Sequence, residues 1–166
     1  PKVGEILNQY FRNQKNFEMV VGGKTRAESI KNALEVLSPK TTQVMIHDAA
    51  RPLISHEIIT QGLKILTSGQ AVITAVKAKD TIKEVMNQQV VSTPDRHKLW
   101  IAQTPQFFEY SVIQKAYQAD GYESATDDAY LVEQSGVPVK ILEGSYENIK
   151  LTTFEDYLFA QRILEN

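Results

Sequence analysis

The chain has 166 residues, of which 42% are hydrophobic, and a formal net charge of −2. Its length and apolar share predict a single domain over residues 1–166 with its own hydrophobic core. The scattered Lys and Arg residues and the lack of long apolar runs argue against binding nucleic acid or crossing a membrane, and the absence of cysteine excludes disulfides, thiolate metal sites and a cysteine nucleophile. This composition favours a cytoplasmic protein.

The first half of the chain alternates between helical and extended patterns. Apolar residues at helical spacing predict helices over 2–11, 26–37 and 56–67, and short apolar runs predict strands over 17–21, 43–47 and 71–76. Alternating strands and helices predict right-handed crossovers and an α/β fold: a Rossmann-like, mostly parallel sheet with helices on both faces.

The pattern changes between residues 77 and 97. Two alternating runs, 80–85 and 90–93, flank the polar turn 86–89 and predict a β-hairpin that no helix covers. An isolated two-stranded ribbon is marginally stable in water, so we expect this arm to be buried by a second subunit. The alternative is a loose surface insertion.

The second half predicts further α/β structure. A strand over 99–102 leads into 104–108, helices follow over 111–119 and 126–134, and another strand covers 137–142. Thr126 or Asp127 is the expected N-cap of the second of these helices, with Asp127 and Asp128 as a charged first turn. The last helix begins near Thr153, which has capping-box spacing to Asp156.

A candidate site follows the strand over 43–47. The strand ends at Asp48, after which Ala49 and Ala50 leave room for a ligand and Arg51 can pair with a phosphate. In an open α/β sheet, ligands bind at the carboxyl edge of the strands. The alternative is a structural ion pair between Asp48 and Arg51 that fixes the corner.

Other segments add polar groups near predicted strand ends. Gly22 and Gly23, followed by Ser29, lie at a strand-to-helix junction that suits a phosphate or a base, although a tight turn explains them equally well. Arg96 and Lys150 lie in loop-like segments and, with Arg51, can bind a phosphorylated substrate.

Seven segments then occur in a fixed order: Gly22-Gly23 with Arg26 and Ser29; His47 to Pro52; Lys79 to Lys83; Asp95-Arg96 with Leu99-Trp100; Thr104-Pro105-Gln106 with Phe108; Thr126 to Ala129; and Glu143-Gly144 through Thr152. Together they resemble the 2-C-methyl-D-erythritol 4-phosphate cytidylyltransferases of the non-mevalonate isoprenoid pathway. The resemblance runs from residue 17 to the end of the chain and implies a nucleotide-diphospho-sugar transferase-like fold.

The resemblance implies a reaction in which CTP and the erythritol phosphate give the CDP-linked polyol and pyrophosphate, with Mg²⁺. It implies nucleotide contacts from Gly22, Gly23 and Ser29. Asp48 and Ala49 would lie at the ribose and substrate, with Asp48 near the metal.

The same resemblance implies a second set of roles around the substrate phosphate. Arg51, Thr104 and Lys150 would bind the methylerythritol phosphate. Thr81 and Arg96, on an arm that reaches across a homodimer, would complete the partner's site. Asp48, Arg96 and Lys150 would then be the catalytic residues.

The chain departs from the family pattern at two places. Lys24 occupies a position that is usually acidic in relatives. The family also begins with a strand and a glycine-rich loop that hold the triphosphate, and nothing before Phe17 matches them. We therefore expect the chain to be the C-terminal portion of a longer enzyme and to be inactive without that loop.

Two other functions are compatible with the same residues. The first is a ribitol 5-phosphate cytidylyltransferase, with the same fold and reaction. The second is a non-catalytic module for dimerisation or nucleotide-sugar binding, although Arg51, Arg96 and Lys150 together favour an enzyme.

Overall fold

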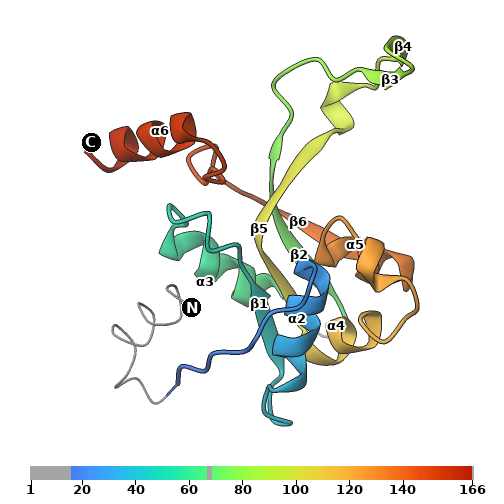
Figure 1. Ribbon diagram of the computed structural model, residues 1–166, viewed down its shortest axis with the longest axis vertical. Coiled ribbons are helices and arrows are strands. Elements are labelled where there is room, and N and C mark those ends of the chain that lie inside the picture. Colours follow the sequence, from blue (N-terminus) through green and yellow to red (C-terminus); the bar gives the residue numbers. More distant parts are fainter. Residues whose placement is uncertain (1–15, 67–68, 166) are drawn as a thin grey trace.

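The computed structural model describes residues 16–66 and 69–165. In chain order its elements are α2 (Arg26–Glu35), β1 (Gln43–Ile46), α3 (His56–Ile65), β2 (Ala71–Lys77), β3 (Glu84–Met86), β4 (Gln89–Ser92), η1 (Arg96–Lys98), β5 (Trp100–Glu109), α4 (Tyr110–Ala116), η2 (Tyr122–Ser124), α5 (Asp128–Gln134), β6 (Val139–Glu143) and α6 (Phe154–Leu164). Figure 1 shows a central sheet with helices around it and an arm that projects from it.

The central sheet has the strand order β1-β5-β2-β6. Strands β2 and β6 are parallel, and β5 is antiparallel to both of its neighbours, β1 and β2. Three of the four strands therefore point the same way, which agrees with the predicted mostly parallel sheet. The direction of β5 follows from the arm: the chain leaves β2, passes through the hairpin and returns directly beside β2, a path that an antiparallel neighbour allows.

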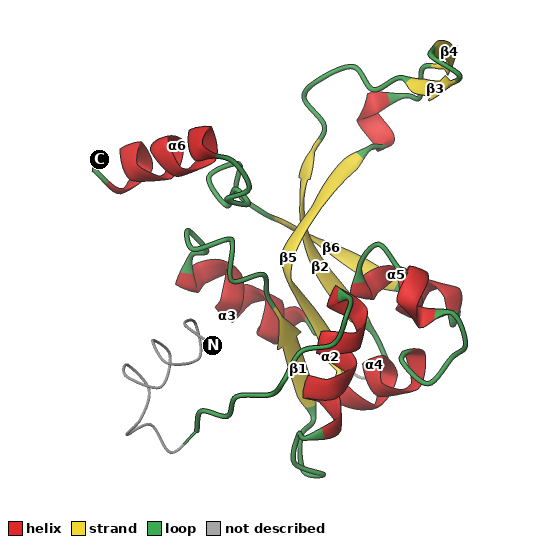
Figure 2. Ribbon diagram, viewed as in Figure 1, coloured by secondary structure: helices red, strands yellow, loops and turns green. Residues whose placement is uncertain are grey.

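Helices cover both faces of this sheet, as predicted (Figure 2). On one face Phe108 packs with Ile113 of α4 and Val132 of α5, and α2 joins the same cluster. On the other face Phe107 packs with Val72 and with Leu66, which follows α3. Successive side chains of a strand point to opposite faces, so these two adjacent phenylalanines anchor both halves of the core.

The N-terminal side of the sheet differs from the sequence prediction. Residues 17–21 form a loop before α2, so the predicted strand is wrong. A strand requires a neighbour to complete its hydrogen-bond ladder, and β1 pairs only with β5 in the part of the chain that the structure describes. The carbonyl of Val21 instead accepts a hydrogen bond from the Asn32 side chain at 3.0 Å. The helix predicted over 2–11 lies outside the described residues.

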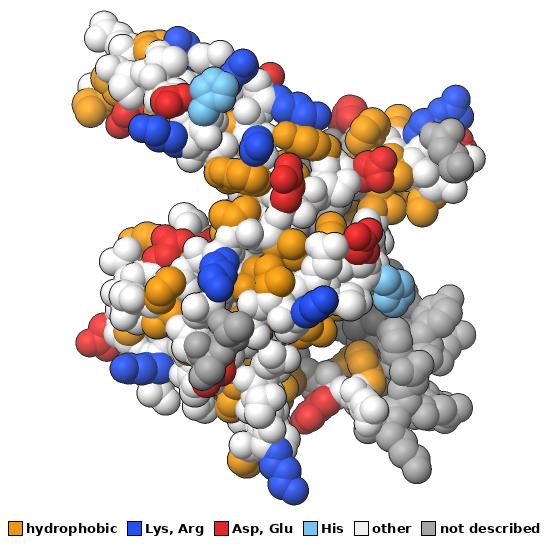
Figure 3. Space-filling view, turned by 180° about the vertical axis from the view of Figure 1, so that it is seen from behind, with side chains coloured by type: hydrophobic (Ala, Val, Ile, Leu, Met, Phe, Trp, Pro, Cys, Tyr) orange, Lys and Arg blue, Asp and Glu red, His pale blue; other side chains and the backbone are white. Residues whose placement is uncertain are grey.

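The predicted hairpin is present as β3 and β4 and stands clear of the sheet (Figures 1 and 3). Its turn residues Asn87 and Gln88 both have positive φ, at 50° and 64°, which is the backbone that matches the twist of a two-residue hairpin. Apolar side chains remain exposed along it: Val85, Met86, Val90 and Val91 are 51–62% exposed.

The remaining helices begin where the sequence indicates. Asp127 is the N-cap of α5 and accepts from the backbone N–H of Tyr130. Thr153 and Asp156 form the predicted capping box of α6. Within residues 16–66 and 69–165, none of the helices has the length and apolar character needed to span a membrane.

Candidate functional site

The candidate site forms where β1 ends at its carboxyl edge. The backbone N–H of Asp48 donates to Thr104 Oγ1 at 2.9 Å, so the end of β1 is fixed to the neighbouring strand β5. The ring of His47 contacts Thr104 Oγ1 and the carbonyl of Arg51, at 3.1 and 3.0 Å. Leu151 N–H donates to the carbonyl of Ala50 at 2.8 Å, which brings the adjacent Lys150 to the same edge.

Three cations surround the carboxylate of Asp48. Lys150 Nζ lies 3.2 Å and Arg51 Nε 3.6 Å from Oδ2, and Arg26 Nε lies 3.4 Å from Oδ1. Partial burial raises the pKa of Asp48, but the hydrogen bond and charge of Lys150 and the charge of Arg26 outweigh it, so this pKa lies below its usual value. The carboxylate is ionised at neutral pH, and the three cations beside it are placed to meet an anionic ligand.

A buried amide orders the loop that follows β6. Arg51 Nη1 donates to the carbonyl of Asn148 at 2.8 Å, and Asn148 Nδ2 donates to the carbonyl of Thr104 at 2.9 Å. Gly144 begins this loop, where a Cβ would lie only 2.5 Å from Gln103 Oε1 and 2.6 Å from a methyl group of Thr74. The absence of a side chain at Gly144 lets the loop pass close to β2 and β5.

Behind the site lies a wholly buried carboxylate. Asp128 is 0% exposed and accepts from Arg26 Nη2 at 2.7 Å and from the hydroxyl of Tyr117. Burial and the nearby charge of Asp128 raise the pKa of Tyr117 far above its usual value, so the phenol remains a donor. Asp128 lies in the first turn of α5, as predicted, but it is also buried, and Arg26 and Tyr117 pair with it in the interior.

A cavity of about 270 Å³ opens between these groups. Of the residues predicted at the site, the lining includes Asp48, Arg51, Thr104 and Lys150. Arg26 also lines it, although no site role was predicted for it. The only signal for Arg26 in the sequence was that it lies in one of the seven segments on which the family resemblance depends.

The residues predicted to contact the nucleotide lie at the start of α2. Gly23 N–H donates to Ser29 Oγ at 3.0 Å, and Ser29 Oγ donates to the carbonyl of Thr25 at 2.9 Å. A Cβ at Gly22 would lie 2.9 Å from Ser29 Oγ. This compact turn directly precedes Arg26, but its residues do not line the cavity. Ala49 follows Asp48 without lining the cavity either.

Thr81 and Arg96 lie on the arm, away from the lining of that cavity. Arg96 Nη1 donates to the carbonyl of Lys79 at 3.0 Å, and Lys79 Nζ lies 3.4 Å from the centroid of the Tyr146 ring. The structure therefore separates the predicted residues into two groups, one at the sheet edge and one at the base of the arm.

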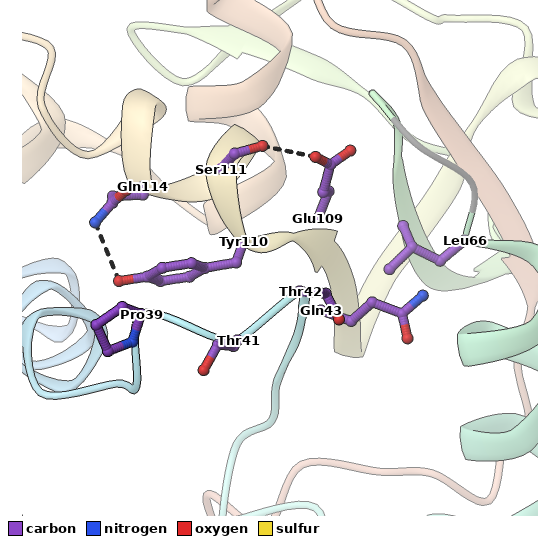
Figure 4. A pocket seen from close by; sticks show the side chains of 9 residues that line it. All are labelled: Pro39, Thr41, Thr42, Gln43, Leu66, Glu109, Tyr110, Ser111 and Gln114. Atoms are coloured by element: carbon purple, nitrogen blue, oxygen red, sulfur yellow. Dashed lines mark hydrogen bonds between the residues drawn. The ribbon is translucent and has the colours of Figure 1, made fainter.

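Another cavity, of about 550 Å³, lies at the opposite end of the sheet, where β1 begins and β5 ends (Figure 4). Its polar groups bond to one another: Gln114 Nε2 donates to Tyr110 Oη at 3.0 Å, and Ser111 Oγ donates to Glu109 Oε1 at 2.7 Å. Its lining contains no Lys or Arg, so it does not suit a phosphorylated substrate.

The residues of the site suit only one kind of metal binding. No group of three or more His, Cys, Asp or Glu side chains that could hold a metal forms among residues 16–66 and 69–165. Asp48 is a single carboxylate among three cations. Such a donor set fits a divalent cation that takes most of its ligands from substrate phosphates and water, as Mg²⁺ commonly does.

Known proteins are similar in sequence to this chain. The family model of 2-C-methyl-D-erythritol 4-phosphate cytidylyltransferase matches residues 3–166. Proteins of that name from Alkaliphilus metalliredigens and Clostridioides difficile are each 45% identical, over 97% and 96% of this chain. The chain spans 68% and 67% of their lengths.

Solved structures share the fold as well. The crystal structure of 4-diphosphocytidyl-2C-methyl-D-erythritol synthase from Anaerococcus prevotii matches with a TM-score of 0.89 and 34% identity, over 99% of this chain and 78% of that one. That of 2-C-methyl-D-erythritol 4-phosphate cytidylyltransferase from Francisella tularensis matches with a TM-score of 0.77, also at 34% identity, over 92% of this chain and 76% of that one. The chain belongs to the 2-C-methyl-D-erythritol 4-phosphate cytidylyltransferase family.

Proposed function

We propose that this protein transfers a cytidylyl group from CTP to 2-C-methyl-D-erythritol 4-phosphate, forming 4-diphosphocytidyl-2-C-methyl-D-erythritol and pyrophosphate in the non-mevalonate isoprenoid pathway. In a chain of this family, the observation that supports the proposal most directly is the arrangement around Asp48. Arg26, Arg51 and Lys150 converge on it in a cavity at the carboxyl edge of the sheet.

This arrangement suits direct phosphoryl chemistry. A phosphate oxygen of the polyol phosphate attacks the α-phosphorus of CTP, a new P–O bond forms, and pyrophosphate leaves with the electron pair of the broken bond. No enzyme nucleophile is required, and rate enhancement comes from positioning and from neutralising negative charge. Cations at the ends of ordered elements supply both effects.

Each candidate residue has a proposed part in this reaction. Arg51, Thr104 and Lys150 bind the polyol phosphate. Asp48 and Ala49 face the ribose and the substrate. The turn of Gly22, Gly23 and Ser29 receives the cytosine, with backbone groups close to the base.

We propose Mg²⁺ as the divalent cation, with Asp48 as its protein ligand. When bound, it would neutralise charge on the triphosphate. The carboxylate of Asp48 at the end of β1 supports this assignment, since Mg²⁺ is usually held by one or two carboxylates together with substrate phosphates.

The arm points to a homodimer. We propose that residues 77–97 reach a second copy of the chain and that Thr81 and Arg96 complete the partner's site, with Arg96 acting on the polyol phosphate. The exposed apolar side chains of the hairpin and the place of Arg96 outside the cavity of its own chain support this. A cytoplasmic location stays a prediction from composition.

Pyrophosphate release tests the function directly. The native protein is incubated with CTP, Mg²⁺ and either 2-C-methyl-D-erythritol 4-phosphate or ribitol 5-phosphate. Release with the erythritol compound at a much higher kcat/KM supports the proposal. Preference for ribitol 5-phosphate would reassign the substrate. Polyol phosphate binding without release from either compound, even when the glycine-rich segment precedes the chain, would indicate a non-catalytic module.

The expected need for a glycine-rich loop is tested in the same assay. The 166-residue chain is compared with a version that carries the glycine-rich segment of a relative before it. The family pattern predicts turnover only in the extended protein, because that loop supplies the charges that hold the triphosphate. Equal rates would refute this requirement.

A further inference from the structure

Asp128 is a buried charge with two strong partners and no exposure to solvent. Its carboxylate accepts from Tyr117 Oη and from Arg26 Nη2, at 2.7 Å for the latter. A charge in the interior is unfavourable unless it is paired and hydrogen-bonded, so both partners are required to keep it there. The neighbouring Asp127 is used differently: its two oxygens accept from Tyr130 N–H and Gln106 Nε2.

Arg26 connects this buried carboxylate to the site. Its Nη2 faces Asp128, while its Nε lies 3.4 Å from Asp48 Oδ1. The planar guanidinium presents donors in fixed directions, so binding one carboxylate along one edge determines where its other donors point. The orientation of Arg26 beside Asp48 is therefore fixed from behind the site.

We propose that Asp128 and Tyr117 are positioning residues for cytidylyl transfer: they hold the guanidinium of Arg26, and Arg26 in turn holds the carboxylate of Asp48 in its reactive orientation. The inference rests on the function proposed above. Neither positioning residue lines the cavity, so neither contacts the substrate. Without Asp128, Arg26 is free to follow an incoming phosphate or to close on Asp48.

A double-mutant cycle on kcat tests whether Asp128 acts through Arg26. Asp128→Asn keeps the size of the side chain and an acceptor for Tyr117 but removes the charge that holds Arg26. We expect it to lower kcat by about 10-fold or more, because small displacements of catalytic groups have effects of that size. In an Arg26→Met background the same substitution should change kcat less than about 2-fold, since its effect passes through Arg26.

Two tyrosine variants accompany the cycle. Tyr117→Phe removes one hydrogen bond from Asp128 and should lower kcat in the same direction by a smaller factor, even if Asp128→Asn fails to fold. Tyr110→Phe is the matched control, because its hydroxyl bonds the carbonyl of Leu34 at 3.0 Å outside this network, and its kcat should stay unchanged. An equal loss from Asp128→Asn in both backgrounds, or no loss from Tyr117→Phe, would overturn the proposal.

A second readout does not depend on activity. In ¹H–¹⁵N spectra of arginine side chains, the Arg26 guanidinium should give separate, slowly exchanging N–H signals, assigned by their loss in Arg26→Lys. Tyr117→Phe should broaden or merge them. Unchanged signals would refute the positioning role. Ordered Arg26 signals in a protein that stays inactive even with the glycine-rich segment before it would refute the proposed function alone.

Discussion

The side chain of Arg51 contacts two partners, a backbone carbonyl and a carboxylate. Its Nη1 donates to the carbonyl of Asn148, and its Nε faces Asp48, while the side chain is 13% exposed. A lysine retains the charge but has a single ammonium group, which cannot reproduce the fork of a guanidinium. The shape of this cation, in addition to its charge, therefore orders the site.

Arg51→Lys tests this distinction. We expect the KM for the polyol phosphate to rise by about 10-fold or more, because a hydrogen bond from a charged group contributes about 1.5–3 kcal/mol. Steady-state kinetics with CTP saturating measures the change. Lys115→Ala, at an exposed position in α4, is the control and should leave KM unchanged. An unchanged KM in Arg51→Lys would show that charge alone is sufficient.

At the residue scale, the sequence predicted the site where its signal was local. Asp48 and Arg51 lie three residues apart at a strand end, and the structure brings Thr104 and Lys150 to them. The sequence placed Asp128 correctly in the first turn of a helix but did not reveal its burial, because nothing next to a helical N-terminus indicates burial. Its partner Arg26 is 102 residues away, and tertiary packing decided the environment of the carboxylate.

Helix α3 and strand β5 meet with no space for a side chain. A Cβ at Gly62 would lie 2.2 Å from ring atoms of Phe107, which is itself 0% exposed. Gly62→Ala would therefore force the helix away from the sheet or the ring from its position. We expect a loss of about 1–3 kcal/mol in the free energy of unfolding, as for other overpacked cores.

Urea denaturation measures the effect of Gly62→Ala. The control is Gln61→Ala in the same helix, where the side chain is exposed and a change within about 0.5 kcal/mol is expected. Equal stability of Gly62→Ala and the wild type would mean that α3 can shift on β5 without cost.

The N-terminus of α6 makes the protein sensitive to acid. One Asp156 oxygen accepts from the backbone and hydroxyl of Thr152 and from the backbone of Thr153, each at 2.8 Å, and these bonds lower the pKa of Asp156 to about 2. In the unfolded chain this pKa is about 3.9. The cap therefore stabilises the fold above about pH 4, and its contribution is lost as the pH falls towards 2.

Thermal unfolding between pH 4 and pH 2 checks whether acid removes the stabilisation by this cap. The midpoint of the wild type should fall further over that range than the midpoint of Asp156→Asn, which has no carboxylate to protonate. Parallel curves would contradict the role of this cap.

At the element scale, capping and periodicity predicted helices well. The Thr153–Asp156 box and the Asp127 N-cap are local features and are confirmed. The strand over 17–21 and the direction of β5 depend on which segments lie beside each other, and no local pattern encodes that. A short, mainly apolar run indicates a strand only if a partner strand is available.

At the scale of the whole molecule, the candidate residues form two groups, with members that line different cavities of the chain. Lys150 lies at the sheet edge and Arg96 at the base of the arm. If the arm completes the site of a second copy, the two residues in one active site come from different chains. The exposed apolar side chains of β3 and β4 would then be covered by the partner.

Complementation tests the shared site. Arg96→Ala and Lys150→Ala should each be nearly inactive as homodimers, with unchanged dimerisation in analytical ultracentrifugation. After the two variants are unfolded together and refolded, heterodimers contain one intact site, and random pairing should restore about a quarter of wild-type activity. No recovery, with heterodimers verified by mass spectrometry, would place both residues in one chain's site.

Strand β5 joins the core and the site within a few residues. Thr104 fixes Asp48, Gln106 reaches the N-cap of α5, and Phe107 and Phe108 fill opposite faces of the sheet. Because side chains alternate along a strand, adding or removing one residue in this stretch would exchange the two faces and displace the polar anchors together. Length variation during the evolution of this chain is therefore expected in the hairpin turn and in surface loops, and excluded between Gln103 and Phe108.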